Sequence, residues 1–265
     1  MTDRPATASS SATGERGGAH FEFLGDHLAI SLPGARVVFT TRRGGFSRGS
    51  YESLNLGRST DDDPDAVRRN RAAVEDLLGV RLAHTRQVHG REVIKIDERT
   101  EASVRAQTAG RVPEADGQAT ALRGIAPSVL VADCLPVAIT GGGAVAVVHA
   151  GWRGLAAGVI QAGVQAVREL GAQRPFHAAI GPGAGPCCYE VGEEVHAAFS
   201  ERLPAARRGD NLDLKLIARS ELEASGVSVV HDTGLCTMCA DPSLFFSHRR
   251  DRGVTGRQAG VAWLS

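Results

Sequence analysis

Aromatic residues are scarce in this chain, and neither sign of charge dominates it. Phe, Tyr and Trp make up 5% of the 265 residues, whereas glycine occurs 32 times. This composition favours short strands, tight turns and close helix packing over a surface that stacks sugars or single-stranded bases. Thirty Lys and Arg residues balance thirty Asp and Glu residues, so no net field attracts nucleic acid or an anionic membrane. Any anion must therefore be bound locally, and the composition favours an enzyme.

A long hydrophobic run is also missing from residues 1–19, which are rich in Ser, Thr, Ala and Gly. Because this segment is too polar for a signal peptide or a membrane span, we expect a disordered tail followed by a single domain over residues 20–265. Cysteines are few and odd in number: Cys134, Cys187, Cys188, Cys236 and Cys239. They predict reduced thiols or metal ligands in a cytoplasmic protein rather than a disulfide framework.

Turn residues and hydrophobic periodicity predict a mixture of strands and helices. Asp63 and Pro64 supply the N-cap and first residue of a helix that ends near Gly79. We expect further helices at residues 155–170, 191–199 and 212–224, and strands beginning at residue 82 and at 37–41, 93–96, 128–132, 137–140, 144–148 and 178–180. Strands and helices do not alternate cleanly, which favours an α/β (α+β) fold with a mixed β-sandwich core flanked by helices.

Three residues with metal-binding side chains follow or end predicted strands, each beside a turn. They are His89, Cys134 and His149. Strand ends converge in folded proteins, and two imidazoles with one thiolate match the ligand preference of zinc. Three protein ligands would leave a fourth position for a reacting group, as in catalytic zinc sites.

Two other interpretations of the same residues remain open at this point. Cys134 could be the nucleophile of a cysteine hydrolase, with His149 as its base. Alternatively, the three residues could be a buried cysteine and two hydrogen-bonded histidines of the core. The spacing along the chain does not separate these alternatives, because the intervals are too long to form a local motif.

Several blocks of sequence resemble the YfiH family, in the order in which the family carries them. They are RQVHG, VADCLPVAI, VAVVHAGWRG, AIGPGAGPCCYEVG and CTMCADPSLFFSHRRDRGVTGRQ. The resemblance extends from about Phe39 to the C-terminus. It implies that His89, Cys134 and His149 are zinc ligands, and that the sandwich is related to cysteine hydrolases of the toxin-deamidase type.

The family is variously labelled laccase-domain protein, polyphenol oxidase, purine nucleoside phosphorylase and peptidoglycan editing factor. The resemblance implies phosphorolysis of adenosine, inosine and methylthioadenosine, with deamination of adenosine to inosine in the same site. An alternative is a hydrolase that removes a wrong amino acid from a cell-wall precursor. Copper-dependent polyphenol oxidation is disfavoured, because a multicopper oxidase needs several His-x-His pairs and this chain has none.

Further residues are candidates for work on a nucleoside and phosphate. Asp133, beside the proposed ligand Cys134, could handle protons, although strand alternation can turn it to the other face. For phosphate or ribose, Arg42, Asn55 and Arg153 are the candidates, because arginines beside glycines can offer both side-chain and backbone donors to an anion. The CxxC motif of Cys236 and Cys239 could bind a second metal, if Cys187 and Cys188 approach it, or could be redox-active, but the sequence favours neither role.

Overall fold

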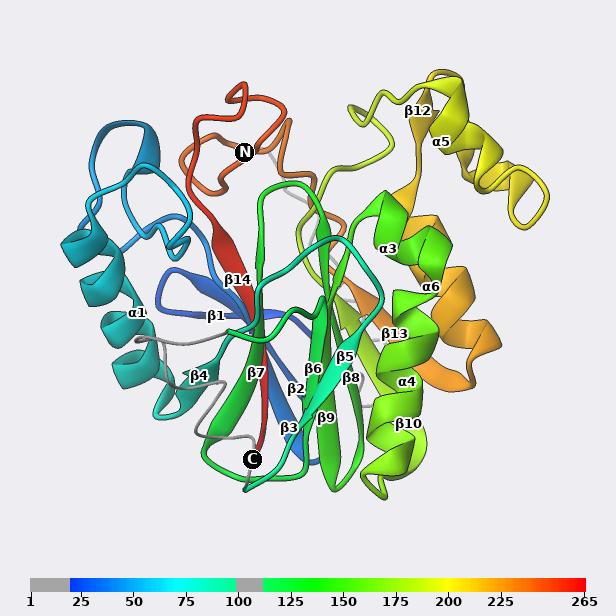
Figure 1. The fold of residues 1–265 in the computed structure, drawn as a ribbon, viewed down its shortest axis with the longest axis horizontal. Coiled ribbons are helices and arrows are strands. Elements are labelled where there is room, and N and C mark those ends of the chain that lie inside the picture. Colours follow the sequence, from blue (N-terminus) through cyan, green and yellow to red (C-terminus); the bar gives the residue numbers. More distant parts are fainter. Residues whose placement is uncertain (1–19, 99–111) are drawn as a thin grey trace, which may run out of the picture.

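Two six-stranded β-sheets pack face to face at the centre of the molecule (Figure 1). The computed structural model describes residues 20–98 and 112–265, so the expected tail at residues 1–19 lies outside the described residues. The first sheet has the order β1 (Glu22–Leu24), β2 (His27–Leu32), β3 (Ala35–Phe39), β14 (Gln258–Leu264), β7 (Ile125–Val131) and β4 (Arg81–Ala83). Its strands are antiparallel except for the parallel pair of β4 and β7.

The second sheet has the order β13 (Val227–Asp232), β10 (Gln173–Ile180), β8 (Leu135–Gly142), β9 (Ala144–Ala150), β6 (Gly117–Thr120) and β5 (Val93–Ile96). Its edge pairs, β10 with β13 and β5 with β6, are parallel, and the inner pairs are antiparallel. A two-stranded ribbon of β11 (Arg207–Arg208) and β12 (Asn211–Leu212) lies outside both sheets. The expected mixed β-sandwich is confirmed.

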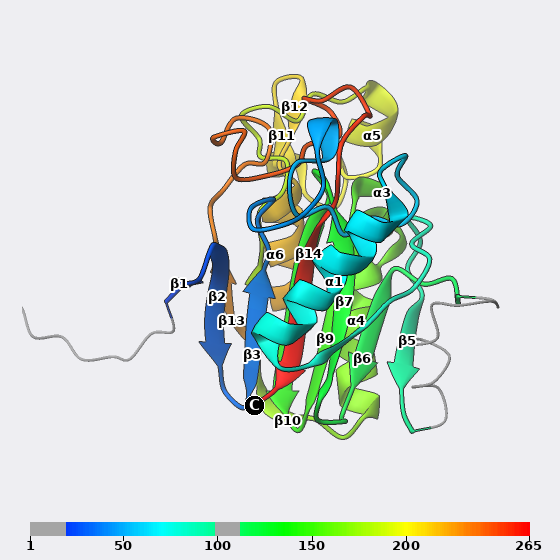
Figure 2. The ribbon, with the colours of Figure 1, turned by 90° about the vertical axis from the view of Figure 1, so that its left-hand side faces the viewer.

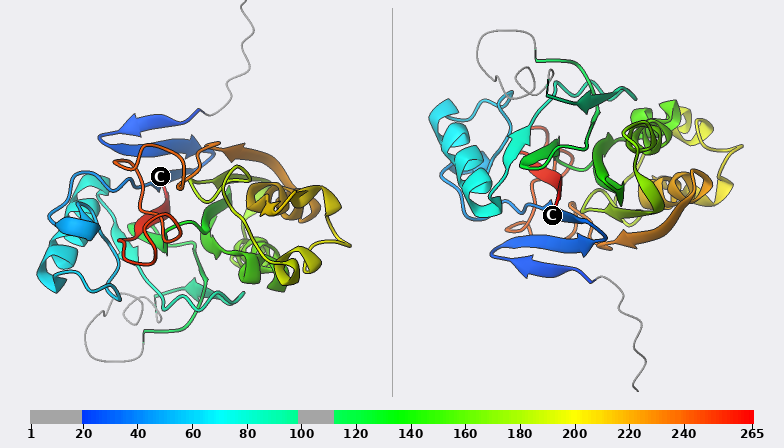
Figure 3. Two further views of the ribbon diagram at one scale, coloured as in Figure 1. Left: turned by 90° about the horizontal axis from the view of Figure 1, so that it is seen from above. Right: turned by 90° about the horizontal axis from the view of Figure 1, so that it is seen from below.

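Helices cover the outer face of each sheet, which gives four layers when the molecule is viewed from above (Figure 3). Helix α1 (Pro64–Leu78) packs on the first sheet (Figure 2). Helices α3 (Trp152–Ala157), α4 (Val159–Glu169) and α6 (Leu214–Ala224) pack on the second. The short helix α5 (Glu193–Ala197) and two 3₁₀ turns, η1 (Gly49–Tyr51) and η2 (Pro204–Ala206), belong to connecting segments.

Strands β8 and β9 are apolar on both faces because each face is covered. Val145 and Val147 contact the first sheet, whereas Ala146 and Val148 contact the helix layer. Each fully buried valine or leucine side chain contributes on the order of 1.5–3 kcal/mol relative to an exposed one. The buried core of the sandwich therefore stabilises the strand ends from which the loops project.

The structure confirms one helix in detail and corrects another. Asp63 accepts a hydrogen bond from the backbone of Asp65, and Gly79 ends α1 with a φ of 67°, as its N-cap and C-cap signals indicated. The single helix expected at residues 155–170 is wrong, because Gly158 adopts a left-handed φ of 92° that separates α3 from α4. No helix among the described residues has the length and apolar character needed to cross a membrane.

Candidate functional site

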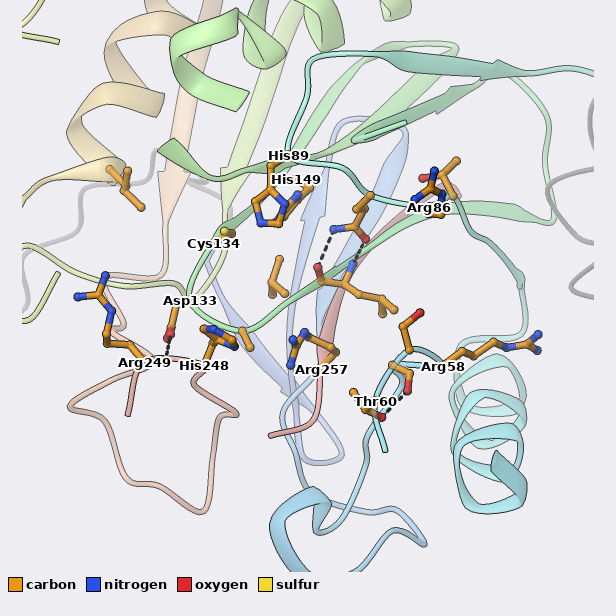
Figure 4. A pocket seen from close by; sticks show the side chains of 18 of the residues that line it. Arg58, Thr60, Arg86, His89, Asp133, Cys134, His149, His248, Arg249 and Arg257 are labelled. Carbon is orange, nitrogen blue, oxygen red and sulfur yellow. Dashed lines mark hydrogen bonds between the residues drawn. The ribbon is translucent and has the colours of Figure 1, made fainter. Parts of the chain in front are cut away.

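Three side chains singled out from the sequence meet at one end of the sandwich (Figure 4). His89 comes from the loop after β4, Cys134 from the turn between β7 and β8, and His149 from the end of β9. Their ligand atoms all lie within 4.8 Å of one another, and the two imidazole rings meet edge to face. Two nitrogens and one sulfur arranged in this way fit a metal ion with three protein ligands.

A buried carboxylate that the sequence did not single out, Asp116, holds both histidines. Its Oδ1 accepts hydrogen bonds from His149 Nδ1 at 2.8 Å and from the backbone of His89 at 2.9 Å. Its Oδ2 accepts from the backbone N–H groups of Val88 at 3.0 Å and Gly90 at 2.7 Å. Because His149 Nδ1 is held by Asp116, the Nε2 atom is the nitrogen left for Cys134 or a metal.

Unusual backbone conformations bring these side chains together. His89 has a φ of 61° and Asp133 a φ of 92°, both in the left-handed region that most residues avoid. The three hydrogen bonds to Asp116 hold the His89 loop in this conformation. Gly151 is needed for a different reason, because a Cβ atom there would lie 2.8 Å from Cys134 Sγ. The cluster therefore depends on close approach of the backbone as well as on its ligands.

Charge interactions within the cluster change the protonation of its side chains. Burial alone would raise the pKa of the Cys134 thiol, but the neighbouring imidazoles, His149 first, lower it to about 6. Burial would lower the pKa of His149, but Cys134 and Asp116 raise it to about 9. Without a metal, the pair is therefore a thiolate beside an imidazolium at neutral pH. A thiolate is also the form of cysteine that binds metals.

The cluster forms one wall of a cavity of about 430 Å³, a size typical of small-molecule sites (Figure 4). Cationic side chains surround it, and the charged residues among the described lining are Arg58, Arg86, Asp133, Arg249 and Arg257. Tyr189 and His248 also line it. Arg86 forms an ion pair with Glu114, so the positive field of the cavity comes mainly from Arg58, Arg249 and Arg257, opposed by Asp133.

Arg257 is the arginine best placed to bind an anion. Its Nη1 donates to the carbonyl oxygens of Thr255 and Gly256, whereas Nε and Nη2 have no partner among the described residues. Burial lowers its pKa, and the charges of Cys134 and Asp133 oppose that shift, so they lie within electrostatic reach. Two adjacent donors of one guanidinium match a pair of phosphate oxygens.

Asn55 does not line the cavity, but it positions residues that do. Its side chain is fully buried, and its Oδ1 accepts from the backbone N–H groups of Gly57 and Arg257, both at 2.9 Å. Its Nδ2 donates to Thr60 Oγ1 and Asp62 Oδ2, also at 2.9 Å. All hydrogen-bonding atoms of this side chain are thus occupied, which leaves Asn55 a positioning role rather than the expected contact with substrate.

The structure does not bring Arg42 or Arg153 to the cavity lining. The Arg42 guanidinium lies 4.4 Å from the ring centroid of Phe246 and donates to Pro242 O at 3.0 Å, so it braces two loops. Arg153 is exposed and lies over the Trp152 ring at 4.4 Å. Gly44 and Gly45 follow shortly after Arg42, and Gly154 follows Arg153. These glycines serve a turn and close backbone packing here rather than an anion.

Asp133 does line the cavity, and its carboxylate is held by two donors. Thr237 Oγ1 donates to Oδ1 at 2.7 Å, and the backbone of Arg249 donates to Oδ2 at 2.7 Å. These bonds tie the β7–β8 turn, and with it Cys134, to the loop between β13 and β14. Proton handling by Asp133 stays a prediction beside this structural role.

Sequence reasoning missed Asp116, Arg257 and His248 as site residues. Asp116 stands directly before β6, a strand that was not predicted, and its neighbours Ala115 and Gly117 carry no signal that distinguishes it. Arg257 and His248 lie within the C-terminal block that resembles the family, but no spacing relates them to His89. Only the folded chain shows that they share a cavity.

The fold and the site place this protein among the α/β sandwich proteins that carry a His/Cys/His cluster at the ends of their strands. A family model described as "Multi-copper polyphenol oxidoreductase laccase" matches residues 36–265, and this chain belongs to that family, which includes the proteins named YfiH. A purine nucleoside phosphorylase of Pseudomonas aeruginosa is 40% identical over 240 residues, covering 86% of this chain and 93% of the relative.

Solved structures show the same fold. YfiH of Bacillus licheniformis is 31% identical with a TM-score of 0.83, and covers 92% of this chain and 99% of its own. YlmD of Geobacillus stearothermophilus is 33% identical with a TM-score of 0.81, covering 95% and 98%. The resemblance to the YfiH family is therefore confirmed across the sandwich and the loops that carry the cluster.

Proposed function

We propose that this chain is a zinc-dependent purine nucleoside phosphorylase. It converts adenosine or inosine and inorganic phosphate into the free base and ribose 1-phosphate, and methylthioadenosine into adenine and 5-methylthioribose 1-phosphate. The observation that carries the proposal is the cavity, which joins the His89/Cys134/His149 cluster to a ring of arginines. The similarity to a P. aeruginosa protein named purine nucleoside phosphorylase supports the choice of reaction.

We assign the zinc ion to the His89/Cys134/His149 cluster because two imidazole nitrogens and one thiolate suit zinc. His89, Cys134 and His149 would hold the ion, and Asp116 would orient His149 as the carboxylate partners of zinc-bound histidines do. When bound, zinc supplies a Lewis acid in the cavity wall. Two imidazoles and a thiolate would also accept Cu²⁺.

Phosphorolysis needs a phosphate held against C1′ of the ribose while the bond to the purine nitrogen breaks. In our proposal Arg257 binds the phosphate through Nε and Nη2, and the neighbouring charges of Arg58 and Arg249 add to the field. A phosphate oxygen forms the new bond to C1′, and the bonding electrons leave with the base. The cavity holds the two reactants together, which lowers the entropic part of the barrier.

The same cavity would also admit the second expected reaction, deamination of adenosine. Water adds at C6 of the purine and ammonia leaves, which yields inosine. No phosphate takes part, so this reaction is separable from phosphorolysis by omitting phosphate. Asp133 lines the cavity and is the acceptor we assign to the proton of the attacking water.

One observation favours a second candidate, a thiol hydrolase. Cys134, His149 and Asp116 are linked in the order nucleophile, base and carboxylate that thiol hydrolases use. In that role the Cys134 thiolate would attack the carbonyl carbon of an amide in a cell-wall precursor, and His149 would protonate the amine as the C–N bond breaks. Water would then hydrolyse the thioester and regenerate the thiol. Amino-acid release from a muramyl peptide by metal-free protein would support this candidate against the phosphorylase.

Product analysis with and without phosphate tests the proposal. Metal-quantified protein is incubated with adenosine and with inosine, beside a Cys134→Ala variant and a His20→Ala control that removes an exposed histidine outside the cavity. We expect base release only with phosphate, loss of the zinc bound by the His89/Cys134/His149 cluster together with base release in Cys134→Ala, and no change in His20→Ala. Base release that survives in Cys134→Ala would exclude the cluster as the active centre.

A further inference from the structure

A second group of thiols lies outside the cavity and has no part in the proposed reaction. Cys187 and Cys188 come from the segment after β10, and Cys236 and Cys239 from the segment after β13. Although the two pairs are far apart in sequence, the four sulfur atoms all lie within 4.8 Å of one another. Cys187 Sγ is 3.4 Å from Cys239 Sγ and 3.5 Å from Cys188 Sγ.

These separations match a metal site better than a disulfide. Four sulfurs around a tetrahedral zinc ion, with Zn–S bonds of about 2.3 Å, lie about 3.8 Å apart. A disulfide requires about 2.05 Å between two sulfurs and leaves the other two cysteines unused. All four cysteines are free thiols in this structure.

The backbone holds each pair of cysteines in a hydrogen-bonded turn. Cys188 N–H donates to Gly185 O at 3.1 Å, and Ala240 N–H donates to Cys236 O at 3.0 Å. A β-bridge between Gly183 and Cys236, with Thr237 N–H donating to Gly183 O at 3.0 Å, joins the two turns. The positions of the sulfurs are therefore set by the backbone of both segments.

Backbone N–H groups also point at the sulfur of Cys236. Gly185 N lies 3.2 Å from this Sγ, and the N–H groups of Met238 and Cys239 bond to it as well. Donors of this kind stabilise a thiolate, the form that binds metals. A Cβ on Gly185 would lie 3.3 Å from Cys187 Sγ and 3.4 Å from Cys236 Sγ, so a side chain there would crowd the cluster.

We propose that Cys187, Cys188, Cys236 and Cys239 bind one zinc ion as a closed, structural site, separate from the His89/Cys134/His149 cluster. Four sulfur ligands fill the tetrahedral coordination of zinc and leave no position for a substrate. The proposal is independent of the reaction that the cavity carries out.

A metal at this site would stabilise the loops that carry part of the cavity lining. Thr237, between two of the cysteines, donates to Asp133 Oδ1, and Tyr189, next to Cys188, lines the cavity. A metal that joins the two cysteine turns therefore fixes the neighbours of Asp133 and Tyr189. It would add to the hydrophobic packing of Leu235 and Ala240, which flank the second pair of cysteines.

Metal counting on three chains tests this assignment. Protein prepared under reducing, zinc-supplemented conditions is gel-filtered and its zinc per chain is measured by plasma mass spectrometry. We expect two equivalents in the wild type, one in Cys134→Ala, and one in a Cys236→Ser/Cys239→Ser chain. Cobalt loaded into Cys134→Ala should give the charge-transfer and intense visible absorption of tetrahedral cobalt with thiolate ligands.

Retention of no metal in Cys134→Ala would overturn the proposal, because that chain keeps all four cysteines of the second group. If the Cys236→Ser/Cys239→Ser chain does not fold, the zinc content and the cobalt spectrum of Cys134→Ala still test the proposed site. Failure of the nucleoside reaction would not affect either result.

Discussion

The two thiol-containing clusters of this protein are built differently. At the His89/Cys134/His149 cluster, a fully buried carboxylate fixes one ring nitrogen and the neighbouring loop, and the open side faces a cavity. At the four-cysteine cluster, only sulfur and backbone N–H groups take part, and Cys187 and Cys239 are exposed. Mixed ligands around an open position are typical of catalytic sites, and closed sulfur sets of structural ones.

The residues around each cluster determine the pKa values of its thiols, and these values differ widely. Cys134 lies beside two imidazoles that lower its pKa to about 6. Burial, the largest influence on Cys188, raises the pKa of its thiol to about 11. When no metal is bound, Cys134 is thus a thiolate at neutral pH, whereas Cys188 is a thiol.

The largest expected effect follows from this difference. In chelated, reduced protein, alkylation of Cys134 by iodoacetamide should rise as the pH increases through about 6 and then level off, because the thiolate reacts. Alkylation of Cys188 should rise only toward pH 11. At pH 7 the two rates should differ by about three orders of magnitude or more. Mass spectrometry of peptides after timed quenching measures both, and equal rates at pH 7 would contradict the assigned charges.

A substitution of the buried carboxylate should separate the two clusters. In Asp116→Asn, the amide presents N–H donors to groups that are themselves donors, so the His89 loop and His149 lose partners. We expect about 10–100-fold weaker metal binding at the cavity cluster and no change at the cysteine cluster. Competition with a chromogenic chelator measures the affinity, and Asp65→Asn on the exposed face of α1 is the control. Unchanged affinity in Asp116→Asn would show that Asp116 does not organise the site.

The smallest of the three expected effects is on the binding of phosphate by Arg257. Arg257→Met keeps the apolar stem and removes the charge-assisted hydrogen bonds, which are worth about 1.5–3 kcal/mol each. We expect KM for phosphate to rise by about tenfold or more, with a smaller change in KM for the nucleoside. Arg153→Met, which removes an exposed arginine outside the cavity lining, is the matched comparison. A phosphate defect in Arg153→Met but not in Arg257→Met would restore the role expected from the sequence.

Much of the central fold could be predicted because local signals and packing agree there. Asp63, Pro64 and Gly79 mark α1, and the apolar runs around Cys134 and His149 are strands that end at the cluster. The break at Gly158 was missed because the apolar pattern continues through it into α4. Strands β2 and β14 were missed too, although both lie inside the first sheet.

The site was only partly predictable, for a physical reason. Metal-binding side chains are few and can be listed from a sequence, but hydrogen-bond partners such as Asp116 are common residues that only tertiary contact distinguishes. The glycines that follow Arg42 and Arg43 suggest an anion site in the sequence, whereas Arg257 is held by Asn55, about 200 residues away. The approach of the two cysteine pairs likewise depends on the parallel pairing of β10 with β13.

Phosphorus NMR of the reaction with inosine tests the central claim most directly. Zinc-loaded protein should convert inorganic phosphate into ribose 1-phosphate in equal amount to the hypoxanthine released, and chelation of the cavity metal should stop both. Release of hypoxanthine with free ribose and no loss of inorganic phosphate would contradict phosphorolysis. So would a fully zinc-loaded protein that leaves inosine and phosphate unchanged.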